Sequence, residues 1–135
     1  MAQNYFKDAF GEFAPRSDKD AAVKFCLNLL IADERWNDLI DLLSADSEIA
    51  GIEGDPGWIL ERRDQGANQA GYSKWPEYAR YRVFVDPEGY CFASPQAYYD
   101  GPTFHRYVRL IVHAYAKSNS VRTESALRVL QLTDS

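Results

Sequence analysis

Cysteine and histidine are scarce in this sequence, and the few that it has stand far apart. The 135 residues include two cysteines, Cys26 and Cys91, and two histidines. No Cys-x-x-Cys or His-x-x-x-His pair occurs, so the ligand spacing of a zinc site is missing and we expect no bound metal. Two cysteines are also too few for a disulfide framework. We therefore expect reduced thiols, as in a cytoplasmic protein.

The chain also lacks a long apolar run. A helix that crosses a bilayer needs about 18 or more apolar residues in sequence. The richest stretch here, residues 29–31, follows Asn28 and is closed by Asp33. Residues 1–10 have neither a basic flank nor an unbroken apolar core, so we expect no signal peptide. These absences argue against a membrane role.

Basic residues are in the minority. Lys and Arg number 15 against 20 Asp and Glu, which gives a net charge of −5. Nucleic-acid binding depends largely on the neutralisation of phosphates by Lys and Arg, so this balance argues against it. An acidic protein suits a basic partner better. The hydrophobic share of 46% is ordinary for a globular protein, and the length predicts one domain over residues 1–135.

Sequence motifs of catalysis are missing. There is no Gly-x-Ser-x-Gly elbow and no glycine-rich loop that ends in Gly-Lys-Ser/Thr. His105 and His113 stand on one predicted helix, roughly 80° apart around its axis and about 12 Å apart along it. They cannot share one metal ion, but either could act alone as a general base. We expect no cofactor. Two alternatives to a binding protein stay open, a small enzyme with a single histidine base and a structural or adaptor subunit.

Three helices are predicted in the first 45 residues. Phenylalanines at positions 6, 10 and 13 indicate a short helix that Pro15 ends. Ser17 is expected to cap a second helix, whose apolar residues recur from position 22 to 31. A third is predicted from Asp33, with an apolar stripe of Trp36, Leu39, Ile40 and Leu43. The glycine-rich residues 51–57 are expected to be a turn that ends this helical part.

The middle of the chain predicts strands, and its end predicts helices. Residues 58–60 could open a strand. Residues 79–85 form the clearest one, followed by a turn at 86–89 and a return at 90–92, which makes a β-hairpin near 79–93. Apolar residues at helical spacing over 104–115 and after Thr123 indicate two more helices. The order predicts an α+β fold of N-terminal helices, a small antiparallel sheet and C-terminal helices.

Acidic residues are concentrated between positions 33 and 55, where Arg35 is the one basic residue. On a regular helix, Glu34, Asp38 and Asp41 would form one stripe at spacings of four and three, and Asp46 follows. A solvent-exposed helix face explains such a stripe. It would also suit docking on a cationic partner, with association accelerated by electrostatic steering.

Aromatic residues gather between positions 72 and 107. On the predicted strand at 79–85, arginines alternate with apolar residues, so Arg80, Arg82 and Phe84 share one face. Such faces can stack nucleic-acid bases, but the glycines of an RNA-binding motif are missing. Packing in the core explains many of these aromatics. Tyr and Trp also anchor protein interfaces, and we single out Trp75 and Tyr78, which stand near predicted loops.

Residues 75–115 carry a family resemblance. They contain Trp-Pro-Glu-Tyr at 75–78, Asp-Pro-Glu-Gly-Tyr at 86–90 and Phe-x-x-Tyr-Val-x-x-Ile-Val-x-x-Tyr at 104–115. This pattern resembles small bacterial immunity proteins that neutralise polymorphic toxins, including those of contact-dependent growth inhibition. The resemblance implies a cytoplasmic protein that binds a cognate toxin domain, often a basic nuclease, and blocks its active site. The expected contacts are Glu34, Asp38, Asp41 and Asp46, then Trp75 and Tyr78.

Overall fold

A computed structural model describes residues 5–44, 51–54, 57–63, 75–88, 92–119 and 124–133. Its N-terminal helices are α1 (Tyr5–Phe10), α2 (Ala21–Ala32) and α3 (Trp36–Leu43). The strands are β1 (Gly51–Gly54), β2 (Trp58–Arg62), β3 (Tyr81–Val85) and β4 (Gln96–Tyr99). Helices α4 (Gly101–Asn119) and α5 (Glu124–Thr133) follow. The predicted α+β arrangement is confirmed.

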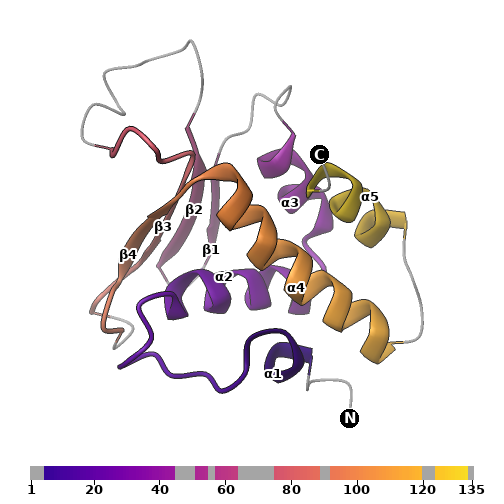
Figure 1. Cartoon of the computed structure of the whole chain (residues 1–135), viewed down its shortest axis with the longest axis horizontal. Coiled ribbons are helices and arrows are strands. Elements are labelled where there is room, and N and C mark those ends of the chain that lie inside the picture. Colours follow the sequence, from indigo (N-terminus) through magenta and orange to yellow (C-terminus); the bar gives the residue numbers. More distant parts are fainter. Residues whose placement is uncertain are drawn as a thin grey trace.

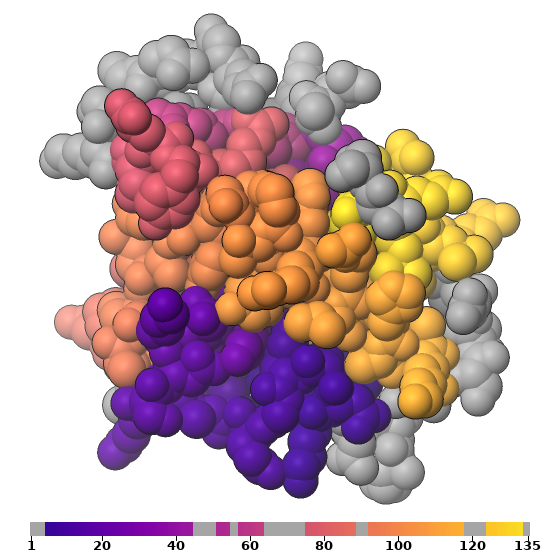
Figure 2. Space-filling model, in the orientation of Figure 1, coloured from indigo at the N-terminus to yellow at the C-terminus, as the bar shows by residue number. Residues whose placement is uncertain are grey.

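The four strands form one antiparallel sheet in the order β1-β2-β3-β4. The described helices lie on one side of it, with α2 against β2, β3 and β4, and α3 against β1 and β2 (Figure 1). Helix α4 crosses in front of α2 and contacts both α1 and α5. The space-filling view shows α4, in orange, lying at the surface between the indigo N-terminal residues and the yellow α5 (Figure 2).

Alternation of side chains in the strands places the core between sheet and helices. In β3, Tyr81, Val83 and Val85 are buried, while the residues between them are only half-buried. This is the alternation predicted for residues 79–85. The ring of Phe104 from α4 stacks on Tyr81 with 4.1 Å between centroids. None of the described helices has the length and apolar character that a membrane crossing needs.

A buried arginine joins the sheet to the end of α3. Arg62 of β2 is 2% exposed, and its Nη1 donates to the carbonyl oxygens of Leu42 and Ser44, each at 2.6 Å. It also donates to the carbonyl of Asp41 at 3.0 Å. The last carbonyls of a helix have no partner within the helix and carry partial negative charge. Arg62 supplies both the hydrogen bonds and the compensating charge.

The helices begin later than the sequence suggested. Ser17 does not cap α2, which starts at Ala21 after a turn in which the Asp18 carboxylate accepts the backbone N–H of Asp20 at 3.0 Å. Helix α3 starts at Trp36, three residues after the predicted Asp33. Glu34 has a φ of 55°. This left-handed conformation interrupts the helical path between α2 and α3.

Residues 51–54 form a strand where the sequence indicated a turn. The two glycines at its ends suggested a loop, but Ile52 is buried opposite Leu60 of β2. A Cβ at Gly54 would overlap the ring of its strand partner Trp58. The glycine therefore allows a buried tryptophan to lie across the edge of the sheet, which a pattern of turn residues does not reveal.

The hairpin that begins with β3 returns later than predicted. Its second strand is Gln96–Tyr99, in which Ala97 pairs with Val83. Of the predicted return at 90–92, residues 90 and 91 lie outside the described residues. Phe92 lies in no strand and packs against Phe25 at 5.4 Å between centroids. Pro95 stands just before this strand, where its carbonyl accepts the N–H of Val85 at 2.8 Å although it has no N–H to donate.

Candidate functional site

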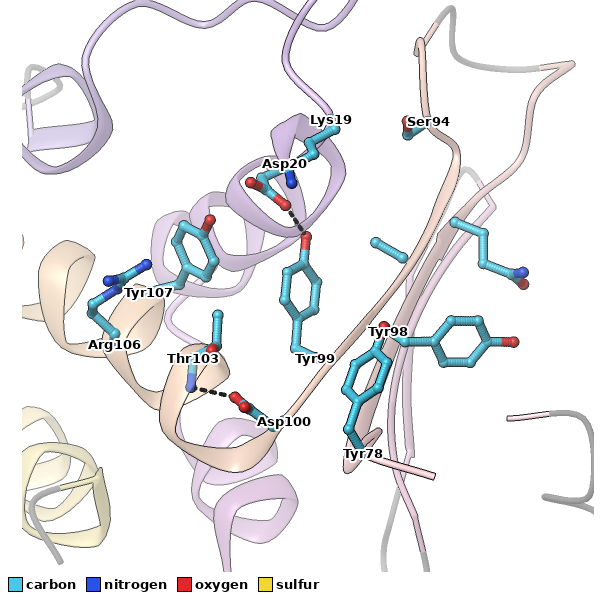
Figure 3. A pocket seen from close by; sticks show the side chains of 12 residues that line it. Lys19, Asp20, Tyr78, Ser94, Tyr98, Tyr99, Asp100, Thr103, Arg106 and Tyr107 are labelled. Carbon is cyan, nitrogen blue, oxygen red and sulfur yellow. Dashed lines mark hydrogen bonds between the residues drawn. The ribbon is translucent and has the colours of Figure 1, made fainter. Parts of the chain in front are cut away.

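A cavity of about 480 Å³ lies where the start of α2, strand β4 and the first turns of α4 meet (Figure 3). Four tyrosines line it, namely Tyr78, Tyr98, Tyr99 and Tyr107. Two cations, Lys19 and Arg106, and two carboxylates, Asp20 and Asp100, complete most of its polar wall. Its walls therefore combine aromatic surface with charges of both signs, a composition suited to recognition.

Asp20 connects the three elements around the cavity. Its Oδ1 accepts a hydrogen bond from the Tyr99 hydroxyl of β4 at 2.7 Å (Figure 3). The same carboxylate also interacts with the Tyr107 hydroxyl of α4. Burial, followed by the bond to Asp20, raises the pKa of Tyr107 to about 12 and also raises the pKa of Tyr99. Both phenols stay protonated near neutral pH, so they remain donors to Asp20.

A second carboxylate beside the cavity is paired with a lysine. Lys24 Nζ lies 2.7 Å from Asp18 Oδ2, and the same nitrogen stands over the ring of Phe10 at 5.7 Å and that of Tyr107 at 6.0 Å. Burial by itself would raise the pKa of Asp18. The hydrogen bonds from Lys24 and from the Asp20 N–H, with the charges of Lys24 and Lys19, outweigh it and hold the pKa below its ordinary value.

Asp100 caps the start of α4. Its Oδ1 accepts the backbone N–H of Thr103 at 2.9 Å, the geometry of a helix N-cap (Figure 3). Hydrogen bonds from Thr103 hold the pKa of Asp100 below its ordinary value. The exposed cations Lys19 and Arg106, in contrast, have no carboxylate within ion-pair distance among the described residues. The guanidinium of Arg106 lies 5.9 Å from the Tyr107 ring.

The two predicted aromatic anchors are brought close to this cavity. Trp75 packs edge-on against Tyr98 with 5.4 Å between ring centroids. Tyr78 is 61% exposed and lines the cavity itself. Its backbone lies in a turn in which the N–H of Ala79 bonds to the Pro76 carbonyl at 3.0 Å. The result is an exposed aromatic side chain on an ordered backbone.

The predicted acidic stripe does not form one helix face. Glu34 is exposed but lies outside α3, in the turn before it. Asp38 Oδ2 accepts Arg35 Nε at 2.7 Å, so its charge is partly compensated. Asp41 is half-buried, and Asp46 lies outside the described residues. None of the three described acids lines the tyrosine cavity.

Neither histidine lines the tyrosine cavity. His105 is half-buried, and its Nε2 lies 3.2 Å from the Tyr81 hydroxyl. Burial, and then the charges of Arg109 and Arg80, hold the pKa of His105 below its ordinary value. His113 is exposed on α4. Cys26 is buried in the core, and burial raises the pKa of its thiol, while Cys91 lies outside the described residues.

The arginines that could have stacked on bases are engaged within the sheet. Arg82 Nε donates to Gln96 Oε1 at 2.9 Å, and its Nη1 pairs with Glu61. Arg80 Nη1 donates to the backbone carbonyl of Arg63 at 2.9 Å. These contacts use N–H donors of both guanidinium groups within the sheet. Fewer donors therefore remain to bind a phosphate backbone.

Lys19, Asp20 and Arg106 were not singled out in the sequence. Asp20 meets a tyrosine 79 residues further along, a separation that no periodicity reveals. Comparison with family models, curated proteins and solved structures found no match to this chain. Its class is therefore defined by fold and site, as an α+β protein with a tyrosine-lined cavity at the edge of a four-stranded antiparallel sheet.

Proposed function

We propose that this chain is a cytoplasmic binding protein that neutralises a cognate bacterial toxin by covering the toxin's active site. The observation that carries the proposal is Tyr78, a large aromatic side chain that is 61% exposed at the rim of the cavity. Trp75 packs against Tyr98, which also lines the cavity. Tyrosine and tryptophan dominate the binding energy of many protein interfaces.

The setting of these side chains favours binding with little loss of entropy. Tyr98 belongs to β4, whose backbone is paired with β3. Asp20 ties the neighbouring Tyr99 to the start of α2. Surfaces that are ordered before binding lose less conformational freedom when a partner docks, which strengthens the complex. A toxin domain seated on this rim would be blocked sterically, without any turnover.

The acidic residues before and in α3 have a secondary role in this proposal. Glu34, Asp38 and Asp41 would attract a basic toxin domain from a distance and so raise the association rate. They lie apart from the tyrosine cavity, and Asp38 is partly neutralised by Arg35. We therefore assign the short-range contacts to the aromatic residues and long-range steering to the acids.

The direct test uses the C-terminal domain of any toxin that is encoded next to the gene of this chain. The purified chain should form a 1:1 complex with the C-terminal domain of that toxin in a calorimetric titration. The toxin's activity should fall to zero at one equivalent, and co-expression should restore growth. A toxin domain that remains fully active beside an excess of the folded chain would refute the proposal.

A further inference from the structure

We propose that the free edge of β4 and the cavity beside it bind an extended acidic segment of a partner protein as an added strand. The inference shares with the proposed function only the surface that binds the partner. It concerns the chemistry of the bound segment, and it stands whether or not that segment belongs to a toxin.

Among the described strands the sheet ends at β4, and the outer edge of β4 offers backbone hydrogen bonds. Val85 N–H donates to the Pro95 carbonyl at 2.8 Å, and the register continues with Val83 opposite Ala97. In an antiparallel pair, the residues between such bonded positions point their N–H and C=O groups to the other side. The backbone groups of Gln96 and Tyr98 therefore face away from β3. They have no backbone partner among the described residues.

The cavity borders this edge. All four residues of β4, Gln96–Tyr99, line it, with Tyr99 directed towards α2 and Tyr98 towards the opposite side (Figure 3). A free strand edge beside an open hollow allows an extended peptide to pair with the backbone while its side chains enter pockets, a frequent mode of peptide recognition.

The charges of the cavity select an acidic segment. Its carboxylates are already hydrogen-bonded, Asp20 to the Tyr99 hydroxyl and Asp100 to the N–H of Thr103. Lys19 and Arg106 are exposed, line the same cavity and have no ion-pair partner within the described part of the chain. Asp20 and Asp100 keep their charge, but their hydrogen bonds occupy acceptor oxygens, and two cations without an ion-pair partner remain to pair with an anionic side chain.

The two faces of the sheet at this edge differ, so they favour a bound segment whose sequence alternates. Successive side chains of an added strand point to opposite faces. Those that point towards the helices would meet Lys19 and Arg106, and those on the other face would meet Tyr98 and Tyr78. The segment that fits best therefore alternates acidic residues with apolar ones.

A model peptide tests this without any toxin. The probe is Thr-Val-Glu-Val-Glu-Val-Thr, blocked at both ends, titrated into ¹⁵N-labelled protein and followed by NMR. We expect saturable shifts of the Gln96 and Tyr98 amides. Replacing both glutamates of the peptide by glutamine should weaken binding about fivefold, as expected for two partly exposed ion pairs. Equal affinity for the two peptides, or no shift at β4, would overturn the inference.

Reversing the charges of Lys19 and Arg106 gives a more specific test of the inference. The double variant Lys19→Glu, Arg106→Glu should lose the acidic peptide and bind the same peptide with lysine in place of glutamate. Both side chains are exposed, so the fold should survive. Arg128→Glu, on the exposed side of α5, is the matched control and should leave the preference unchanged. A double variant that still prefers the acidic peptide would contradict the assigned role of the two cations.

The contribution of the strand edge is tested at Gln96. Gln96→Pro removes the outward N–H, a change that edge strands tolerate, whereas Gln96→Ala removes only the side chain. Binding of the acidic peptide should be lost in the first and kept in the second. Equal binding by both would exclude strand addition. Concentration-dependent dimerisation that protects the β4 amides would place a second copy of the chain at this edge and also overturn the inference.

Discussion

The hydroxyl of Tyr99 lies 2.7 Å from Oδ1 of Asp20, and this bond joins the last strand of the sheet to the start of α2. Both residues line the cavity that the exposed Tyr78 also lines, so the bond forms part of its wall. Tyr99 itself is 7% exposed, so the bond forms in a largely dry environment. Removing it tests whether the wall depends on this one contact.

Tyr99→Phe should lower the free energy of unfolding by about 1 to 2 kcal/mol, because a charged acceptor loses one of its donors. Urea unfolding followed by circular dichroism measures the change. Tyr98→Phe is the matched control on the same strand, and no hydrogen bond of its hydroxyl is described, so little change is expected there. A Tyr99→Phe protein with the same free energy of unfolding as the wild type would show that this bond does not stabilise the fold.

Arg62→Met should cost about 2 to 3 kcal/mol of folding free energy. The methionine can fill part of the space, but it leaves the buried carbonyl of Leu42 and the part-buried carbonyl of Ser44 without their donor. Chemical denaturation of this variant beside Arg128→Met, an exposed position on α5, separates the role of the carbonyl contacts from loss of charge. Similar stability of the two variants would contradict the capping role of Arg62.

His105 should make the protein less stable as the solution becomes acidic. Its folded-state pKa lies below the ordinary value of 6.5, because burial and then Arg109 and Arg80 disfavour the charged ring. Its contribution is therefore fully present above about pH 6.5 and is lost as the pH falls through the lower folded-state pKa. Unfolding measured between pH 7.5 and pH 5 should show this loss, and His105→Gln should reduce it. NMR titration that gives a pKa above 6.5 would contradict the assignment.

Reversing the three described acids, with Glu34→Lys, Asp38→Lys and Asp41→Lys together, should slow association with a basic toxin domain about tenfold at low salt. The dissociation rate should change little, and the difference should shrink as salt screens the charges. Stopped-flow or surface-plasmon-resonance kinetics at two salt concentrations measure both rates. Glu88→Lys, an exposed acid beyond β3, serves as the control. Unchanged association in the triple variant would remove the steering role.

Much of the fold follows from local patterns. The alternation of residues 81–85 and the apolar stripe of α4 each predict the observed element, because burial on one face requires that periodicity. Strand β1 escaped prediction because its glycines indicate a turn, although Gly54 is needed to accommodate the ring of Trp58. The place of β4 after Pro95 also depends on pairing with a distant strand.

The site was harder to predict than the fold. Tyr78 was singled out in the sequence as an interface aromatic near a predicted loop, and its side chain is 61% exposed. The spacing of Glu34, Asp38 and Asp41 assumed an unbroken helix, and the left-handed backbone at Glu34 breaks it. Lys19 and Arg106 join one cavity through the crossing of α2 and α4 near β4, which depends on tertiary packing alone.

The central claim is that Tyr78 anchors a neutralised toxin domain on this surface. The most direct measurement is the calorimetric affinity of that domain for the wild type, for Tyr78→Ala and for Leu127→Ala, which truncates an exposed apolar side chain on α5. We predict that Tyr78→Ala weakens binding by about 30-fold or more, as expected for an interface hot spot, and that Leu127→Ala changes it less than about twofold. Equal affinities for all three proteins would contradict the account.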